Sequence, residues 1–149
     1  DENNDVVLDG LKSMYSSMQM EQEQEALLNA VIAKNPSNFV ALANLGMMYI
    51  QKNDADNAIK NLKLALAAKP DNVTVLTYLG ACYNSKGGAL QDPNGRKVVY
   101  KEAIKVLDKA KELDPEKAQA NWGYTRYQAY YGYYGPTAAE TKKAEEESK

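Results

Sequence analysis

The chain of 149 residues contains no histidine, and it has only one cysteine, one tryptophan and one phenylalanine. Without histidine it lacks the usual general base and the commonest metal ligand, and no Ser-His-Asp or Cys-His arrangement can be built. Cys82 has no second cysteine to pair with, so neither an intramolecular disulfide nor a cysteine metal cluster can form. We therefore predict a protein that is not an enzyme, with no metal site and no cofactor.

The chain also lacks a surplus of positive charge and a long apolar run. Its formal net charge is -2, so it has none of the basic excess that is typical of nucleic-acid-binding proteins. No stretch of about eighteen apolar residues occurs, and we expect no transmembrane segment. The sequence begins at Asp1 rather than Met. A signal peptide before Asp1 would indicate the periplasm or cell envelope, and without one we expect the cytoplasm.

The sequence contains a repeated pattern of leucine, glycine, tyrosine and proline. Pro36 and Pro70 are 34 residues apart, and the pattern Leu-x-x-Leu-Gly-x-x-Tyr that begins at Leu42 begins again 34 residues later at Leu76. A weaker copy, with lysine in place of the glycine, begins at Leu8. The two leucines and the tyrosine share one face of a helix, and the glycine beside them allows a second helix to approach closely. We expect this glycine to accept alanine but to reject leucine.

This period and pattern resemble the tetratricopeptide repeat family, in which each unit consists of two antiparallel helices. The resemblance implies an all-α fold, namely an α-solenoid of stacked antiparallel helix pairs that form a right-handed superhelix. We expect eight helices in a single domain, 1–149. The expected units are a degenerate first repeat at 5–36, a second at 39–70, a third at 73–115 with an eleven-residue insertion at 87–100, and a terminal capping helix pair at 116–149.

Local signals add detail to the third unit. The sequence "DPNG" at 92–95 predicts a β-turn inside the insertion, and its surroundings do not match a calcium-binding loop. Asp71 and Asp114 are predicted to be helix N-caps, with Pro115 in the first turn of the helix that follows. Gly87 falls where the chain should turn between two helices.

The terminal unit is rich in tyrosine, since six of the eleven tyrosines lie between Trp122 and Gly135. Four of them repeat the spacing of the leucine pattern and are predicted to be the core face of the helix. This tyrosine stripe consists of Tyr124, Tyr127, Tyr131 and Tyr134. The opposite tryptophan side consists of Trp122, Arg126, Ala129 and Tyr133, with Tyr130 at its edge. The tryptophan side either lines a binding groove or packs on the last helix, and the sequence leaves both interpretations open.

The resemblance implies that the same side of each first helix lines a concave groove for protein partners. The candidate binding residues are Val40, Ala43, Asn44, Met47, Ile50, Thr74, Thr77, Tyr78, Ala81, Trp122, Arg126, Tyr130 and Tyr133. The first unit would add Val6, Asp9, Ser13, Ser16 and Ser17. A carboxylate clamp, which some members of the family use to hold a peptide C-terminus, needs Lys, Arg and Asn in the groove. Only Asn44 matches it, although Arg126 is a candidate to hold an acidic group of a ligand.

The function that we expect is a non-catalytic protein–protein interaction scaffold that binds a peptide or a partner helix in the groove. One alternative is a bacterial cell-envelope accessory protein that stacks a glycan on Trp122 and Tyr133. Another is an assembly module that associates with itself into a homo-oligomer. The expected partner is a protein or peptide and not a nucleic acid.

Overall fold

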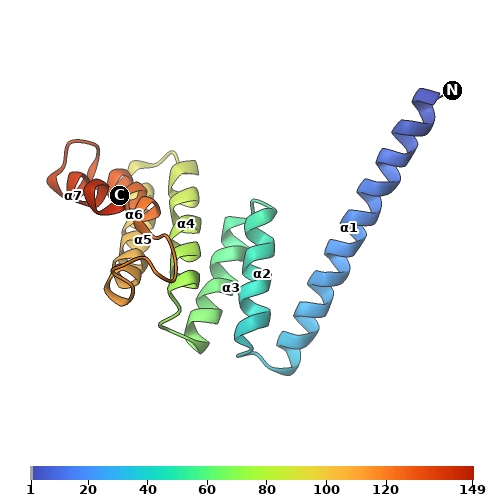
Figure 1. Ribbon diagram of the computed structural model, residues 1–149, viewed down its shortest axis with the longest axis horizontal. Coiled ribbons are helices and arrows are strands. Elements are labelled where there is room, and N and C mark those ends of the chain that lie inside the picture. Colours follow the sequence, from blue (N-terminus) through green and yellow to red (C-terminus); the bar gives the residue numbers. More distant parts are fainter. Residues whose placement is uncertain (1) are drawn as a thin grey trace.

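The computed structural model of the chain consists of α-helices joined by short connections. It describes the backbone of residues 2–149 and the side chains of residues 17–149. The helices are α1 (Glu2–Lys34), α2 (Phe39–Gln51), α3 (Ala55–Ala68), α4 (Val73–Ala89), α5 (Pro93–Leu113), α6 (Gly123–Tyr134) and α7 (Ala139–Ser148). Helices α2 to α7 follow one another along the molecule, and no strand occurs within residues 2–149 (Figure 1). The all-α repeat solenoid is thereby confirmed.

The first unit differs from the expectation. Residues 2–34 form one continuous helix where we expected two, so residues 2–149 contain seven helices rather than eight. In the second unit, Asn53 turns the chain between the helices with a left-handed φ of 58°. One period earlier stands Gln19, which is a good helix former, and nothing from Ser17 to Glu25 breaks a helix. Among the groove residues expected in this unit only Ser17 has a described side chain, and it is exposed.

The glycines of the repeat pattern lie where the two helices of each pair pack closely, as predicted. A Cβ atom on Gly46 of α2 would lie 2.6 Å from the Leu62 side chain of α3. Gly80 of α4 faces Leu107 of α5 in the same way, at 2.5 Å. Both leucines are fully buried, so even an alanine at either glycine would have to displace a packed core side chain. We expected from the sequence that these glycines would tolerate alanine, but the packing indicates that they do not.

The insertion at 87–100 lengthens two helices instead of forming a long loop. Helix α4 continues through Gly87 to Ala89, and α5 begins at Pro93, so only three residues connect them. The expected turns at Gly87 and at "DPNG" are wrong. The Asp92 carboxylate instead caps α5, because it accepts hydrogen bonds from two backbone N–H groups in the first turn of this helix. Pro93 follows the cap as the first residue of the helix, a position that suits proline.

Both predicted N-caps, Asp71 and Asp114, are wrong. The observed N-caps of α2, α3 and α4 are Asn38, Asp54 and Asn72. Asp71 is exposed beside one of them and pairs with Lys109 at 3.4 Å. Asp114 ends α5 rather than starting a helix, and residues 115–122 form a non-helical connection to α6. The remaining unit boundaries stay predictions.

Candidate functional site

The groove residues of the second and third units lie together between α2 and α4. A hollow of about 220 Å³ is lined by Ala43, Asn44, Met47, Thr74 and Tyr78, and by Phe39, Leu62, Asn72 and Val75. A second hollow of about 280 Å³ is lined by Ile50, Tyr78 and Ala81, and by Asn53, Ala55, Cys82 and Ser85. Because Tyr78 lines both, we treat them as one surface and call it the α2–α4 groove. Five of the predicted residues thus line the first hollow and three line the second, with Tyr78 counted in both.

Two further candidates on these helices do not line the groove. Val40 is exposed, and Thr77 is half-buried with its hydroxyl donating a hydrogen bond to the Val73 carbonyl at 2.8 Å. The hydroxyl of Thr77 is therefore used within α4. Phe39 and Asn72, which do line the groove, stand at the starts of their helices, where the repeat spacing gives no signal for them.

The chemistry of the α2–α4 groove suits binding. None of the residues that line its two hollows is charged, and the polar groups are amides, hydroxyls and one thiol. Burial raises the pKa of the Cys82 thiol to about 11, so the thiol stays protonated at neutral pH and is a poor nucleophile. The surface offers apolar contact and neutral hydrogen bonds, and no ionised group that would serve as a general acid or base.

The face of α6 that we expected to line the groove points to the core instead. Trp122 is 2% exposed and Arg126 is 7% exposed, so the expectation that these two side chains line an open groove is wrong. Conversely, Tyr124 is 60% exposed and Tyr131 is 47% exposed. The tyrosine stripe, predicted to be the core face, points mainly to solvent.

A tight connection after α5 holds Trp122 in the core. Its indole Nε1 donates a hydrogen bond to the Asp114 carbonyl oxygen at 2.7 Å. The Asp114 carboxylate accepts hydrogen bonds from the backbone N–H groups of Ala118, Gln119 and Ala120. Burial acts to raise the pKa of Asp114, but these three hydrogen bonds outweigh it and lower the pKa. The connection therefore fixes the approach of the chain to α6 and orients the indole inward.

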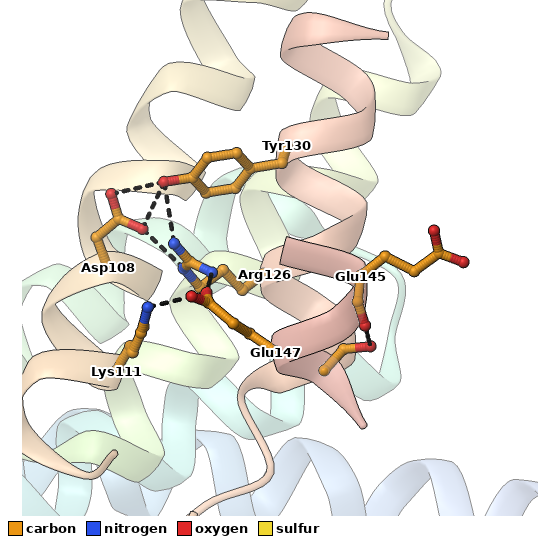
Figure 2. Close-up of polar contacts among 7 residues, drawn as sticks. Asp108, Lys111, Arg126, Tyr130, Glu145 and Glu147 are labelled. Atoms are coloured by element: carbon orange, nitrogen blue, oxygen red, sulfur yellow. Dashed lines mark hydrogen bonds and ion pairs between the residues drawn. The ribbon is translucent and has the colours of Figure 1, made fainter. Parts of the chain in front are cut away.

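Arg126 is engaged by the protein's own acidic residues, as Figure 2 shows. Its Nε donates to Asp108 of α5 at 2.8 Å, and its Nη1 donates to Glu147 of α7 at 2.7 Å. The Tyr130 hydroxyl accepts from Arg126 at 3.2 Å and donates to Asp108 at 2.9 Å. Lys111 pairs with Glu147 at 2.8 Å. Since the guanidinium already links α5, α6 and α7, it is not available to a ligand's acidic group, and that expectation is corrected.

The remaining aromatic candidates do not form a stacking platform with Trp122. Tyr130 belongs to the Arg126 cluster, where burial, followed by the hydrogen bond with Asp108, raises its pKa to about 12. Tyr133 is half-buried and makes an edge contact with Tyr134, with the ring centroids 4.7 Å apart. A glycan stacked jointly on Trp122 and Tyr133 would need the indole exposed, and the indole is buried.

Within the described residues, no cluster of three or more acidic or cysteine side chains is arranged to hold a metal ion. Along the same residues, no helix combines the length and the apolar character needed to cross a membrane.

One stretch of the chain matches a known family. Residues 40–72 match the family model of the tetratricopeptide repeat. The matched range contains nearly all of α2 and the whole of α3, and hence the α2 side of the α2–α4 groove. No curated protein is significantly similar to the chain.

Proposed function

We propose that this chain, a member of the tetratricopeptide repeat family, is a non-catalytic scaffold that binds a peptide or a partner helix in the α2–α4 groove. Repeats of this family generally mediate protein–protein interactions. The observation that carries the proposal is the hollow between α2 and α4, which is lined by five of the residues that the resemblance to the family assigned to the groove. Concave, mostly apolar surfaces with a few polar groups are typical of binding sites.

The size and lining of the groove indicate what it would hold. Its two hollows, of about 220 Å³ and about 280 Å³, are each smaller than the roughly 300–1,000 Å³ that a drug-sized ligand needs, so each suits an anchoring side chain of a larger partner. Met47 and Phe39 supply adaptable apolar walls, while Asn44 and Thr74 supply neutral hydrogen bonds at the rim. Because the lining contains no lysine or arginine, we expect an internal apolar segment rather than a terminal carboxylate.

Site-specific photo-crosslinking tests this proposal. A photoreactive residue is placed at Met47, and a control is placed at Val98, which is exposed on α5 outside the groove. The captured partner is then purified and its affinity measured. We expect Tyr78→Ala to weaken binding at least about tenfold, since aromatic anchors commonly dominate binding energy, and Val98→Ala to leave it unchanged. A partner that crosslinks equally from both positions, or that binds Tyr78→Ala like the parent, contradicts the proposal.

A second candidate function, self-association, is favoured by the described part of α1. This helix extends away from α2 along much of its length (Figure 1). It exposes three large apolar side chains, Met18, Met20 and Leu27, and Leu27 is 66% exposed. Burying such side chains against a second copy would stabilise a dimer. Light scattering after size exclusion should show a dimer that Leu27→Glu dissociates and Val98→Glu does not. A parent protein that stays monomeric at high concentration removes this candidate.

A further inference from the structure

A third hollow, of about 430 Å³, lies between α5 and the outward face of α6. It is lined by Arg96, Tyr100, Tyr124, Tyr127, Gln128, Tyr131 and Gly132, and we call it the tyrosine pocket. It shares no residue with the α2–α4 groove and is therefore a separate site. The sequence did not predict the tyrosine pocket, because the repeat spacing predicted that the tyrosine stripe would be buried in the core.

Three exposed or half-buried rings form a continuous aromatic ridge along the pocket. The ring centroids of Tyr124 and Tyr127 are 6.1 Å apart, and those of Tyr127 and Tyr131 are also 6.1 Å apart. The rings are tilted by 47° and 75° to one another, so they make a ribbed surface rather than a flat platform. At the floor, any side chain on Gly132 would clash with the ring of Tyr100, which is buried between the two helices.

The polar groups of the tyrosine pocket are one side chain that only donates hydrogen bonds and several that both donate and accept. Arg96 can only donate, and it takes no part in the ion pairs formed among residues 17–149. Gln128 and the phenol hydroxyls donate as well, and no carboxylate lines the pocket. The complementary ligand therefore has apolar ring faces, hydrogen-bond acceptors and a negative charge.

We propose that the tyrosine pocket binds a proline-rich peptide segment that carries an acidic residue. Such a segment forms a polyproline II helix with three residues per turn, which leaves its proline rings and backbone carbonyl oxygens free for contact. The ridge of Tyr124, Tyr127 and Tyr131 offers a row of exposed or half-buried rings against which proline rings can pack. Aromatic-lined grooves are a recurrent way of binding this conformation.

The backbone of the same segment fits the donors of the pocket. Proline has no N–H group, and the carbonyl oxygens of a polyproline II helix make no internal hydrogen bonds, so the ligand offers acceptors that the phenol hydroxyls and Gln128 can satisfy. The acidic residue pairs with Arg96. A neutral saccharide is less complementary, because it offers no negative charge to Arg96.

Titration with defined peptides tests the proposal on the full chain. The probe is a capped peptide of sequence PPPEPPP, and the comparison peptides are PPPQPPP and GGGEGGG. Two-dimensional NMR of protein labelled at tyrosine follows Tyr124, Tyr127, Tyr131 and the distant Tyr78. We expect PPPEPPP to shift the three pocket signals without shifting Tyr78, and GGGEGGG to shift none.

Variants then separate the ring contacts from the charge. Tyr131→Ala should weaken PPPEPPP at least about tenfold, as expected for an aromatic anchor. Arg96→Gln should weaken it about threefold, on the scale of an exposed ion pair, and should abolish the preference for PPPEPPP over PPPQPPP. The matched control is Lys101→Gln, which removes an exposed charge from α5 outside the pocket and should have no effect. Circular dichroism checks that each variant is folded.

Three outcomes overturn the proposal. The first is the absence of shifts at the three pocket tyrosines with millimolar PPPEPPP. The second is equal binding of GGGEGGG, or shifts centred on Tyr78. The third is stronger binding of a saccharide probe, either cellohexaose or hexagalacturonate, which would assign the tyrosine pocket to glycans.

Discussion

The central helix pair α4–α5 and the terminal pair α6–α7 pack in different ways. In α4–α5, Gly80 lets the fully buried Leu107 fit against the facing helix. In α6–α7, the last helix buries only Thr141 and Ala144, and α6 buries the charged Arg126. A small polar helix cannot cover a row of tyrosine rings. Helical spacing therefore identifies a face, but the neighbouring helices decide whether that face is buried.

The difference extends to how the last helix is held. Glu147 of α7 accepts a hydrogen bond from Arg126 and pairs with Lys111, and the Thr141 hydroxyl donates to the Gly135 carbonyl at 2.7 Å. Directional contacts of this kind fix one geometry, although desolvation offsets part of their attraction. The terminal pair is thus held mainly by polar contacts, while the central pair is held by packing.

The largest expected effect comes from Trp122→Ala. The change removes a fully buried indole and its hydrogen bond to Asp114, and it should lower the free energy of unfolding by about 3–5 kcal/mol. Tyr124→Ala, on the exposed side of the same helix, should change it by less than about 0.5 kcal/mol. Urea denaturation measures both. Equal losses, or a larger loss for Tyr124→Ala, would show that the orientation of α6 is wrong.

Arg126→Met tests the polar cluster and should have the next largest effect. It leaves Asp108 and Glu147 without their shared cation, and we expect a loss of about 1.5–3 kcal/mol, the scale of hydrogen bonds to charged groups. Lys111→Met is the matched control, because its ammonium is more exposed and should contribute no more than about 1 kcal/mol. The two variants are compared by urea denaturation, and a similar small loss for both contradicts the role assigned to Arg126.

Gly80→Ala tests the central pair. The added methyl group would press on Leu107, and we expect a loss of about 1–3 kcal/mol from overpacking. Gly88→Ala is the control on the same helix, since its methyl group would meet only the Tyr100 hydroxyl, at 3.6 Å. That change should raise stability by up to about 1 kcal/mol through helix propensity. Thermal unfolding gives both shifts, and the same sign for both would contradict the close α4–α5 contact.

The smallest effect is a pH dependence that arises from Glu147. The hydrogen bond with Lys111 lowers the pKa of this carboxyl, burial opposes the shift, and the charges of Arg126 and Lys111 lower it further. Because the folded-state pKa is depressed, the stabilisation is present above the unfolded value of about 4.5 and is lost as the pH falls through the folded value. Glu147→Gln should therefore flatten the fall in unfolding free energy below about pH 4.5. Parallel curves for parent and variant would exclude this contribution.

Much of the central region could be predicted from the sequence because its signals are local and agree with one another. The recurring glycines, leucines and prolines set the register, and the register brought Ala43, Met47 and Tyr78 to one groove. The continuous α1 was not predicted, because a weak copy of the repeat suggested a turn where Gln19 favours a helix.

The terminal pair could not be predicted because its arrangement depends on contacts distant in sequence. Trp122 is drawn inward by the Asp114 carbonyl, and Arg126 by carboxylates on two other helices. None of these partners is visible in the spacing along α6. The exposed aromatic surface of α6 is therefore the tyrosine stripe and not the tryptophan side.

The fluorescence of Trp122 tests the orientation of α6 most directly, since it is the only tryptophan in the chain. Because the indole is 2% exposed, we predict blue-shifted emission in the native protein and little quenching by iodide, with both reversing on denaturation. Tyr124→Ala and Tyr131→Ala should leave the emission unchanged. Native emission at the wavelength of tryptophan in water, with ready quenching by iodide, would place the indole at the surface and contradict the account of α6.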